Sequence, residues 1–280
     1  MLRSAARVAA FALVLMAAGA ASALPVFSAI AGPGHSNTIG NCIVNGAGGQ
    51  FQPTPPSADT VCGDGNGNNH ASSAASIGHV GSSSDAAATS FQITSTEAQA
   101  TYADTVTFSG PGGSVLVSLN VFFGGVLNSA LGAPADMRAL VVINGIIVAT
   151  INASAAAGTC SSTFAGGAGC VGMGLPGGLL LGTQQVDVLV GVPITFEFDL
   201  FTDAGADFPG ASARAEFSNS LDFVTGIDLF NLPDGFTANS ESAFIVNNRF
   251  LPPGNGVPEP GTLALLAAAM LAGLARRRSH

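Results

Sequence analysis

The sequence predicts an all-β protein: an antiparallel two-sheet β-sandwich, jelly-roll-like, with an apolar helix at each end of the chain. Three observations favour this fold. Apolar and polar residues alternate with a period of two through much of residues 87–251, which is typical of strands with one buried face. Turn residues, among them many of the 37 glycines, separate the alternating runs. No convincing helical pattern lies between the two ends.

The first element is an apolar segment at the start of the chain. Arg3 and Arg7 precede the uncharged run 8–20, and Ala21-Ser22-Ala23 supplies the small residues that a signal peptidase requires. The run is shorter than the roughly 20 residues of a spanning helix. Residues 1–23 are therefore predicted to be a secretory signal peptide, and cleavage exposes Leu24.

The next segment, residues 24–86, is rich in glycine, serine and asparagine and lacks clear periodicity. We expect an irregular segment that contributes at most one edge strand. The chain has four cysteines, an even number that favours disulfides in an oxidising compartment. Local pairs, Cys42–Cys62 and Cys160–Cys170, are favoured because each flanks a loop-like stretch, and the other two connectivities remain open. The spacings match no zinc motif.

The β-sandwich domain is predicted over residues 87–251. Its strands are expected near residues 102–108, 115–123, 140–148, 186–190, 194–200, 213–217, 221–230 and 244–250. Asn144-Gly145 lies between two apolar runs and predicts the tip of a hairpin, because both turn positions need positive φ.

Composition excludes several classes of function. Charged residues make up 9% of the chain, and all eight basic residues are arginines, so a nucleic-acid binder is not expected. Residues 24–256 contain sixteen acids and three arginines, a net charge of −13. Such a domain does not bind anionic surfaces by direct charge attraction.

The sequence offers no catalytic set, and we expect no enzyme. No Gly-x-Ser-x-Gly motif occurs, and His35, His70 and His79 are expected in solvated loops. Glu197 and Asp199 share a strand face, but that face is opposite to the core, so the pair is expected to be solvated. A secreted hydrolase is therefore the least favoured alternative.

Calcium is the only cofactor with any support. Oxygen-bearing side chains alternate at 64, 66 and 68, as in calcium loops, but Ala75 stands where the closing glutamate would be. A second acidic loop lies at 203–207, beside a strand acid at 199. Ordinary turn chemistry accounts for the same residues. The candidate ligands are Asp64, Asn66, Asn68, Asp199, Asp203 and Asp207.

The last segment, residues 252–280, combines a proline-rich linker, the motif Val-Pro-Glu-Pro at 257–260, an uncharged run at 261–275 and three arginines at 276–278. As a helix the apolar run would be about 22 Å long, less than the ~30 Å of a hydrocarbon core. The arginines would stop translocation. This layout is like that of tail signals that are removed after sorting.

This tail resembles the PEP-CTERM sorting signal. The resemblance implies an exosortase that recognises Val257, Pro258, Glu259 and Pro260, with Arg276, Arg277 and Arg278 as the stop signal. It also implies transient anchoring in the inner membrane of a Gram-negative bacterium, followed by release to the cell surface or extracellular matrix. The segment Ala213–Leu229 resembles the last strands of many PEP-CTERM ectodomains, which are β-sandwiches without assigned enzymatic activity.

These observations favour an exported, exosortase-processed, non-enzymatic surface or matrix protein associated with exopolysaccharide and biofilm. The alternative is a glycan-binding module that acts on the cell's own polysaccharide. The absence of tryptophan and the single tyrosine weaken this alternative, because sugar platforms favour those rings. A concave sheet face with an exposed aromatic ring would support it.

Overall fold

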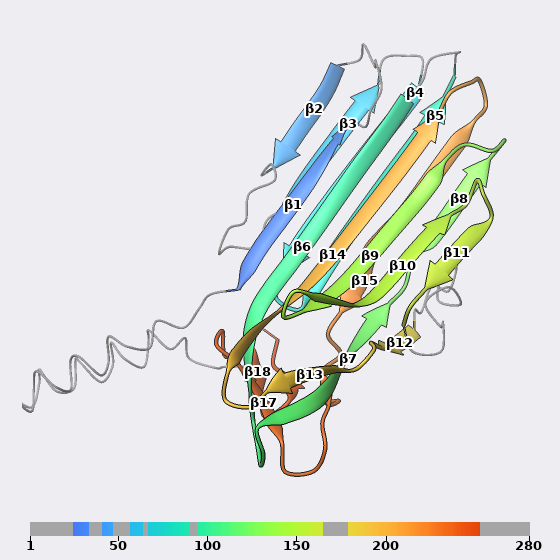
Figure 1. Ribbon diagram of the computed structural model, residues 1–280. Coiled ribbons are helices and arrows are strands. Elements are labelled where there is room, and N and C mark those ends of the chain that lie inside the picture. The colour runs from blue at the N-terminus through green and yellow to red at the C-terminus, as the bar shows by residue number, and fades with distance from the viewer. Residues whose placement is uncertain are drawn as a thin grey trace, which may run out of the picture. The chain divides into compact units, whose positions relative to one another are not determined.

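The computed structural model describes residues 25–33, 41–46, 57–63, 67–89, 94–164 and 179–252 (Figure 1). The β-rich part is one compact unit, Leu24–Pro252. It is all-β, and every strand pair is antiparallel. The described residues include no helix, and hence none that could cross a membrane. The expected terminal helices, 1–23 and 261–275, lie outside the described residues.

The strands form two large sheets and one small hairpin. The seven-stranded sheet has the order β1 (Val26–Pro33), β6 (Thr94–Ser109), β14 (Pro193–Ala206), β9 (Ala135–Ile143), β10 (Ile146–Ser154) and β11 (Thr159–Ser162), with β17 (Thr237–Ser240) also pairing β6. The ten-stranded sheet has the order β12 (Leu179–Gly182), β7 (Ser114–Phe123), β15 (Ser212–Asp222), β5 (His79–Ala88), β4 (Gly67–Ser76), β3 (Ser57–Gly63) and β2 (Asn41–Gly46). On this sheet, β13 (Val186–Leu189) and β16 (Phe230–Asn231) pair β7, and β8 (Val126–Ala130) pairs β15. The hairpin is β18 (Ile245–Val246) with β19 (Arg249–Phe250).

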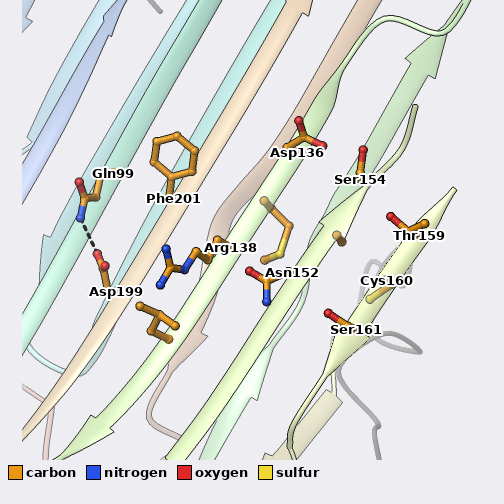
Figure 2. A pocket seen from close by; sticks show the side chains of 13 residues that line it. Gln99, Asp136, Arg138, Asn152, Ser154, Thr159, Cys160, Ser161, Asp199 and Phe201 are labelled. Carbon is orange, nitrogen blue, oxygen red and sulfur yellow. Dashed lines mark hydrogen bonds between the residues drawn. The ribbon is translucent and has the colours of Figure 1, made fainter. Parts of the chain in front are cut away.

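The two large sheets pack face to face as a β-sandwich, with their long strands running in roughly the same direction (Figure 1). Alternate residues point inward, as the burial of β9 and β14 shows. Where Figure 2 shows the other face of the seven-stranded sheet, the labelled side chains are mainly polar. The alternation predicted from the sequence is therefore confirmed for the strands over 115–123 and 194–200.

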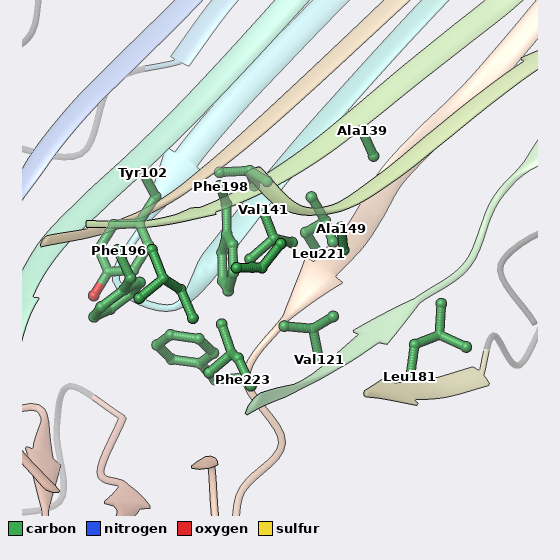
Figure 3. Close-up of a cluster of buried hydrophobic side chains, with 14 of the residues drawn as sticks. Tyr102, Val121, Ala139, Val141, Ala149, Leu181, Phe196, Phe198, Leu221 and Phe223 are labelled. Carbon is green, nitrogen blue, oxygen red and sulfur yellow. The ribbon is translucent and has the colours of Figure 1, made fainter. Parts of the chain in front are cut away.

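Aromatic rings fill one part of the core. Tyr102, Phe196, Phe198 and Phe223 are buried together, and their ring centroids lie 5.1–6.2 Å apart (Figure 3). Such edge-to-face and tilted pairs stabilise a core beyond the area that they bury. Strands β6 and β14 of one sheet thus meet the end of β15 from the other.

Small side chains fill another part of the core. A buried cluster there consists entirely of alanines: Ala86, Ala88, Ala133, Ala135, Ala204, Ala206, Ala211 and Ala213. Nearby, the buried Ser82 hydroxyl lies 2.7 Å from the Thr202 hydroxyl and donates to the carbonyl of Ala98 at 2.9 Å. Ser84 Oγ lies 3.0 Å from the same Thr202 hydroxyl. Direct bonds between such short side chains require that β5 and β14 lie close together.

Removing the Thr202 hydroxyl tests this contact. We expect Thr202→Val to lower the free energy of unfolding by about 1–2 kcal/mol, because the two serines lose a buried partner without a change of shape. The measurement is urea denaturation. Thr195→Val, at an exposed position of the same strand, is the control and should change stability by less than about 0.5 kcal/mol. Equal losses in both variants would contradict a role for the inter-sheet bonds.

The hairpin predicted at Asn144-Gly145 is confirmed. The two residues have φ of 51° and 76° and join β9 to β10, with Ile143 opposite Ile146. The register then shifts by one between Ile147 and Ala149, so β10 contains a bulge.

Gly145 is needed for its backbone conformation rather than for space, since a Cβ there would meet nothing within 4 Å. We expect Gly145→Ala to cost about 1 kcal/mol of stability through strain at positive φ. Gly113 is the matched control, because it is equally open and lies outside the positive-φ region. Thermal and urea unfolding of both variants measure the difference, and a loss at Gly113 as large as that at Gly145 would rule out strain as the cause.

The N-terminal part differs from the expectation of an irregular segment. Strands β1 to β5 lie within residues 26–88, and β2 to β5 pair in sequence order as a meander. The domain therefore begins near residue 24 and not at residue 87. On the inner faces of β4 and β5, alanines and serines such as Ala71, Ala75 and Ser82 take the place of the usual large apolar residues. The sequence therefore lacks the alternation of large apolar and polar residues by which strands are recognised.

The strand order also departs from the predicted jelly-roll-like arrangement. A jelly roll is built from two Greek keys, whereas consecutive strands β2–β5 and β9–β11 each form a meander within one sheet.

His70 and His79, expected in loops, lie on β4 and β5. Each faces a carboxylate: His70 is 4.0 Å from Asp85, and His79 contacts Asp222. His35 lies outside the described residues.

A buried carboxylate joins β6 to the turn after β17. Asp104 accepts hydrogen bonds from the Ser242 hydroxyl, from the Tyr102 hydroxyl at 3.3 Å and from the Thr105 amide at 2.7 Å. Burial nevertheless raises the pKa of Asp104 from 3.8 to about 6. Folding therefore binds a proton between these two values, and this group's contribution to stability is lost as the pH rises through 6.

Asp104→Asn removes this titration. We expect the stability of the wild type, relative to Asp104→Asn, to increase by about 1.5 kcal/mol between pH 8 and pH 5. Urea unfolding of both proteins at several pH values measures this difference, and other titrating groups cancel in the comparison. A stability difference that does not change with pH, or that changes in the opposite direction, would contradict a raised pKa at Asp104.

Candidate functional site

The outer face of the seven-stranded sheet contains a hollow of about 650 Å³. Strands β6, β14, β9, β10 and β11 form its floor, and the side chains that line it project from alternate positions of these strands (Figure 2). Those that point outward are Gln99, Asp136, Arg138, Leu140, Asn152, Ser154, Thr159, Ser161, Asp199 and Phe201.

The strand register arranges these side chains in rows that cross the sheet. The central row runs from Gln99 to Phe201, Arg138, Asn152 and Ser161, each directly opposite the next. Neighbouring strands are about 4.8 Å apart, so a row of five strands extends about 19 Å. The hollow is thus elongated across the strands rather than along them.

Asp199 is held in place within the sheet. Its Oδ1 atom accepts a hydrogen bond from Gln99 Nε2 at 2.7 Å (Figure 2) and another from Thr101 Oγ1 at 2.9 Å. Both donors are on the neighbouring strand β6. No described residue donates to Asp199 Oδ2, which leaves that oxygen able to accept a hydrogen bond from a ligand.

Arg138 is the single basic residue among the described residues that line the hollow. It lies on β9 between Phe201 and Asn152, and it is exposed. It forms no ion pair within the part of the chain that the structure describes, although Asp136 and Asp199 both line the same hollow. Its five donors are therefore open to a ligand.

Glu197 adds negative charge beside the hollow. It lies two residues before Asp199 on the same face of β14. Burial and, after it, the charge of Asp199 raise the pKa of Glu197. Glu197 and Asp199, which were expected to be solvated, are both half-buried. Asp199 also accepts hydrogen bonds from neighbouring side chains of the sheet.

The described calcium candidates, Asp199, Asp203 and Asp207, belong to no group of side chains that could hold a metal ion. Asp64 and Asn66 lie outside the described residues, and of Asn68 only the backbone in β4 is described. Asp203 lies on β14 opposite Asp136, and Asp207 is exposed beyond the end of that strand. The described residues contain no group of three or more His, Cys, Asp or Glu side chains that could hold a metal ion.

The cysteine pairings stay predictions. The backbone register of β2 and β3 places Cys42 directly opposite Cys62. Directly opposed residues of antiparallel strands have Cα atoms about 4.5–5.5 Å apart, within the range that a disulfide spans. Cys160 lies on β11 at the hollow, and Cys170 lies outside the described residues.

Sequence reasoning missed Arg138, Asn152 and Phe201. Arg138 could have been noted, because it alternates with the apolar Met137 and Ala139 and must face outward. That Asn152 lies opposite Arg138 depends on the bulge in β10, and Phe201 joins them only through the pairing of β14 with β9. These two relations are long-range and have no local signal.

The residues of the expected sorting signal lie outside the described residues. They are Val257, Pro258, Glu259, Pro260, Arg276, Arg277 and Arg278. Residues 256–279 match the family model of the PEP-CTERM protein-sorting motif. No curated protein and no solved structure matches the chain. The molecule is thus a β-sandwich followed by a sorting tail. It carries the PEP-CTERM motif, as the resemblance predicted, and this motif implies a secreted protein whose tail is processed by an exosortase.

Proposed function

We propose that this protein is a non-enzymatic component of the bacterial cell surface or extracellular matrix, delivered there by exosortase processing and associated with exopolysaccharide. The match of residues 256–279 to the sorting motif carries the proposal. The predicted signal peptide at 1–23 supports it, because export must precede recognition of the tail.

The tail is suited to temporary anchoring. Its apolar run, 261–275, is short for a bilayer, and Arg276–Arg278 would hold its end in the cytoplasm. We expect the prolines around the motif to favour an extended backbone that an enzyme at the membrane surface can bind. The proposed order is export, retention through 261–275, cleavage near 258–260 and release of the sandwich.

A second candidate function is glycan binding by the sandwich itself. The observation that favours it is the elongated hollow on the outer face, which combines polar side chains with the ring of Phe201. Binding sites of this kind place a few polar groups around an apolar contact. In this role the protein would bind the polysaccharide of the cell that exports it.

Glu259 is the only charged residue between Arg249 and Arg276 and so is the natural specificity residue for the processing enzyme. We expect Glu259→Ala to leave most of the protein uncleaved in the membrane fraction. Asp234→Ala, at an exposed acid of the sandwich, is the control and should be processed normally. Intact-mass spectrometry of surface and membrane fractions determines the C-terminal end in each case.

Neutral residues in place of Arg276–Arg278 should likewise prevent correct processing, since the stop signal is lost. Mature surface protein from the wild type that still contains residues 263–275 would contradict the proposal. It would show that the tail is a permanent anchor.

A further inference from the structure

We propose that the hollow on the outer face of the seven-stranded sheet binds an uncharged, hydroxyl-rich polysaccharide segment, which lies across strands β6, β14, β9, β10 and β11. This inference rests on the proposed function as a matrix protein and specifies the site and the ligand class.

The shape fits a linear chain. The central row from Gln99 to Ser161 crosses five paired strands, a length of about 19 Å. Several linked sugar rings can lie along a row of that length, whereas a single small molecule would occupy only part of it.

The hydrogen-bonding groups fit hydroxyls. Arg138 and Asn152 supply donors, and Asp199 Oδ2 supplies an acceptor that no described residue uses. A hydroxyl both donates and accepts, so a ligand covered with hydroxyls can satisfy both kinds of group. The fixed position of Asp199 against Gln99 and Thr101 means that little ordering is needed on binding.

The apolar contact is Phe201, with Leu140 diagonal to it on the next strand. Phe201 is only partly buried although its neighbours along the strand, Leu200 and Thr202, are fully buried. An aromatic ring beside polar groups provides a surface for the C–H face of a sugar ring. In Figure 2 the ring stands between Gln99 and Arg138, within the central row.

The charge of the site favours an uncharged ligand. Asp136 and Asp199 lie on either side of the Arg138 row, Glu197 is close by, and residues 24–256 carry a net charge of −13. A chain of carboxylated or sulfated sugars would meet repulsion along most of its length. One arginine cannot offset that repulsion at every repeat of a polyanion.

The outer face of the ten-stranded sheet provides the contrast. There the exposed arginine, Arg214, is already paired with Asp85 at 3.4 Å and with Glu216 at 3.0 Å. Its donors have acceptors within the protein, while those of Arg138 have none among the described residues. Arg214 is therefore a matched control for Arg138.

The test uses the full mature chain, purified from the cell surface, and the extracellular polysaccharide of the producing cells. Anion exchange separates that polysaccharide into a neutral pool and an acidic pool. Affinity electrophoresis in gels that contain each pool gives the association constant. The proteins compared are the wild type, Arg138→Ala, Phe201→Leu, Asn152→Ala and Arg214→Ala, with circular dichroism to confirm that each is folded.

We expect the neutral pool to retard the wild type and Arg214→Ala equally. Arg138→Ala should bind at least about tenfold more weakly, because a hydrogen bond from a charged donor is lost. Phe201→Leu and Asn152→Ala should each weaken binding several-fold. Retardation by the acidic pool alone, by neither pool, or equally for wild type and Arg138→Ala would each overturn the proposal.

The outcome is separable from that of the sorting proposal. Cleavage of the tail is determined from the C-terminal mass, and binding is determined from retardation of the folded sandwich. If the tail is cleaved but the variants of the hollow bind like the wild type, the proposed binding site is refuted and the sorting proposal is not. If the protein binds through Arg138 but retains residues 263–275, the sorting proposal is refuted and the binding site is not.

Discussion

The close approach of the two sheets at their small-residue end is the constraint on which the rest of the structure depends. Ser82 and Ser84 of β5 reach the hydroxyl of Thr202 on β14 directly, at 2.7 and 3.0 Å. A larger side chain in any of these positions would separate the sheets. Because side chains alternate along a strand, an inward Thr202 places Phe201 and Asp203 on the outer face. The composition of the candidate site thus follows from the contact between the sheets.

The same strands take part in a different kind of packing further along. In β6 and β14 the inward positions change from small residues, such as Ala98 and Thr202, to the rings of Tyr102 and Phe196. Interiors pack densely, so the space between the sheets must follow the size of these side chains. The buried Asp104 lies at the aromatic part, where hydrogen bonds from Ser242 and Tyr102 satisfy it. Polar groups therefore join the two sheets at the small-residue part of the core, whereas at the aromatic part they join β6 to the turn after β17 of the same sheet.

The sequence predicted the local features and missed the long-range ones. Period-two alternation was sufficient for β7 and β14, and Asn144-Gly145 was sufficient for the hairpin tip. Strands β4 and β5 were missed because small residues such as Ala71 and Ser82 occupy their inner faces, and small residues carry little hydrophobic signal. The bulge in β10 was also missed, since two consecutive buried residues, Val148 and Ala149, break the alternation only locally.

That bulge decides which residues can act together at the candidate site. Without the one-residue shift, the register set by Ile143 and Ile146 would place Ile151 opposite Arg138, and Asn152 would lie in another row. With it, Ile151 stays in the core and Asn152 joins Arg138 in the central row. Each outward side chain is then flanked along its own strand by buried residues, as Arg138 is by Met137 and Ala139. A site built on strands anchored in this way is fixed before any ligand arrives, which lowers the entropic cost of binding.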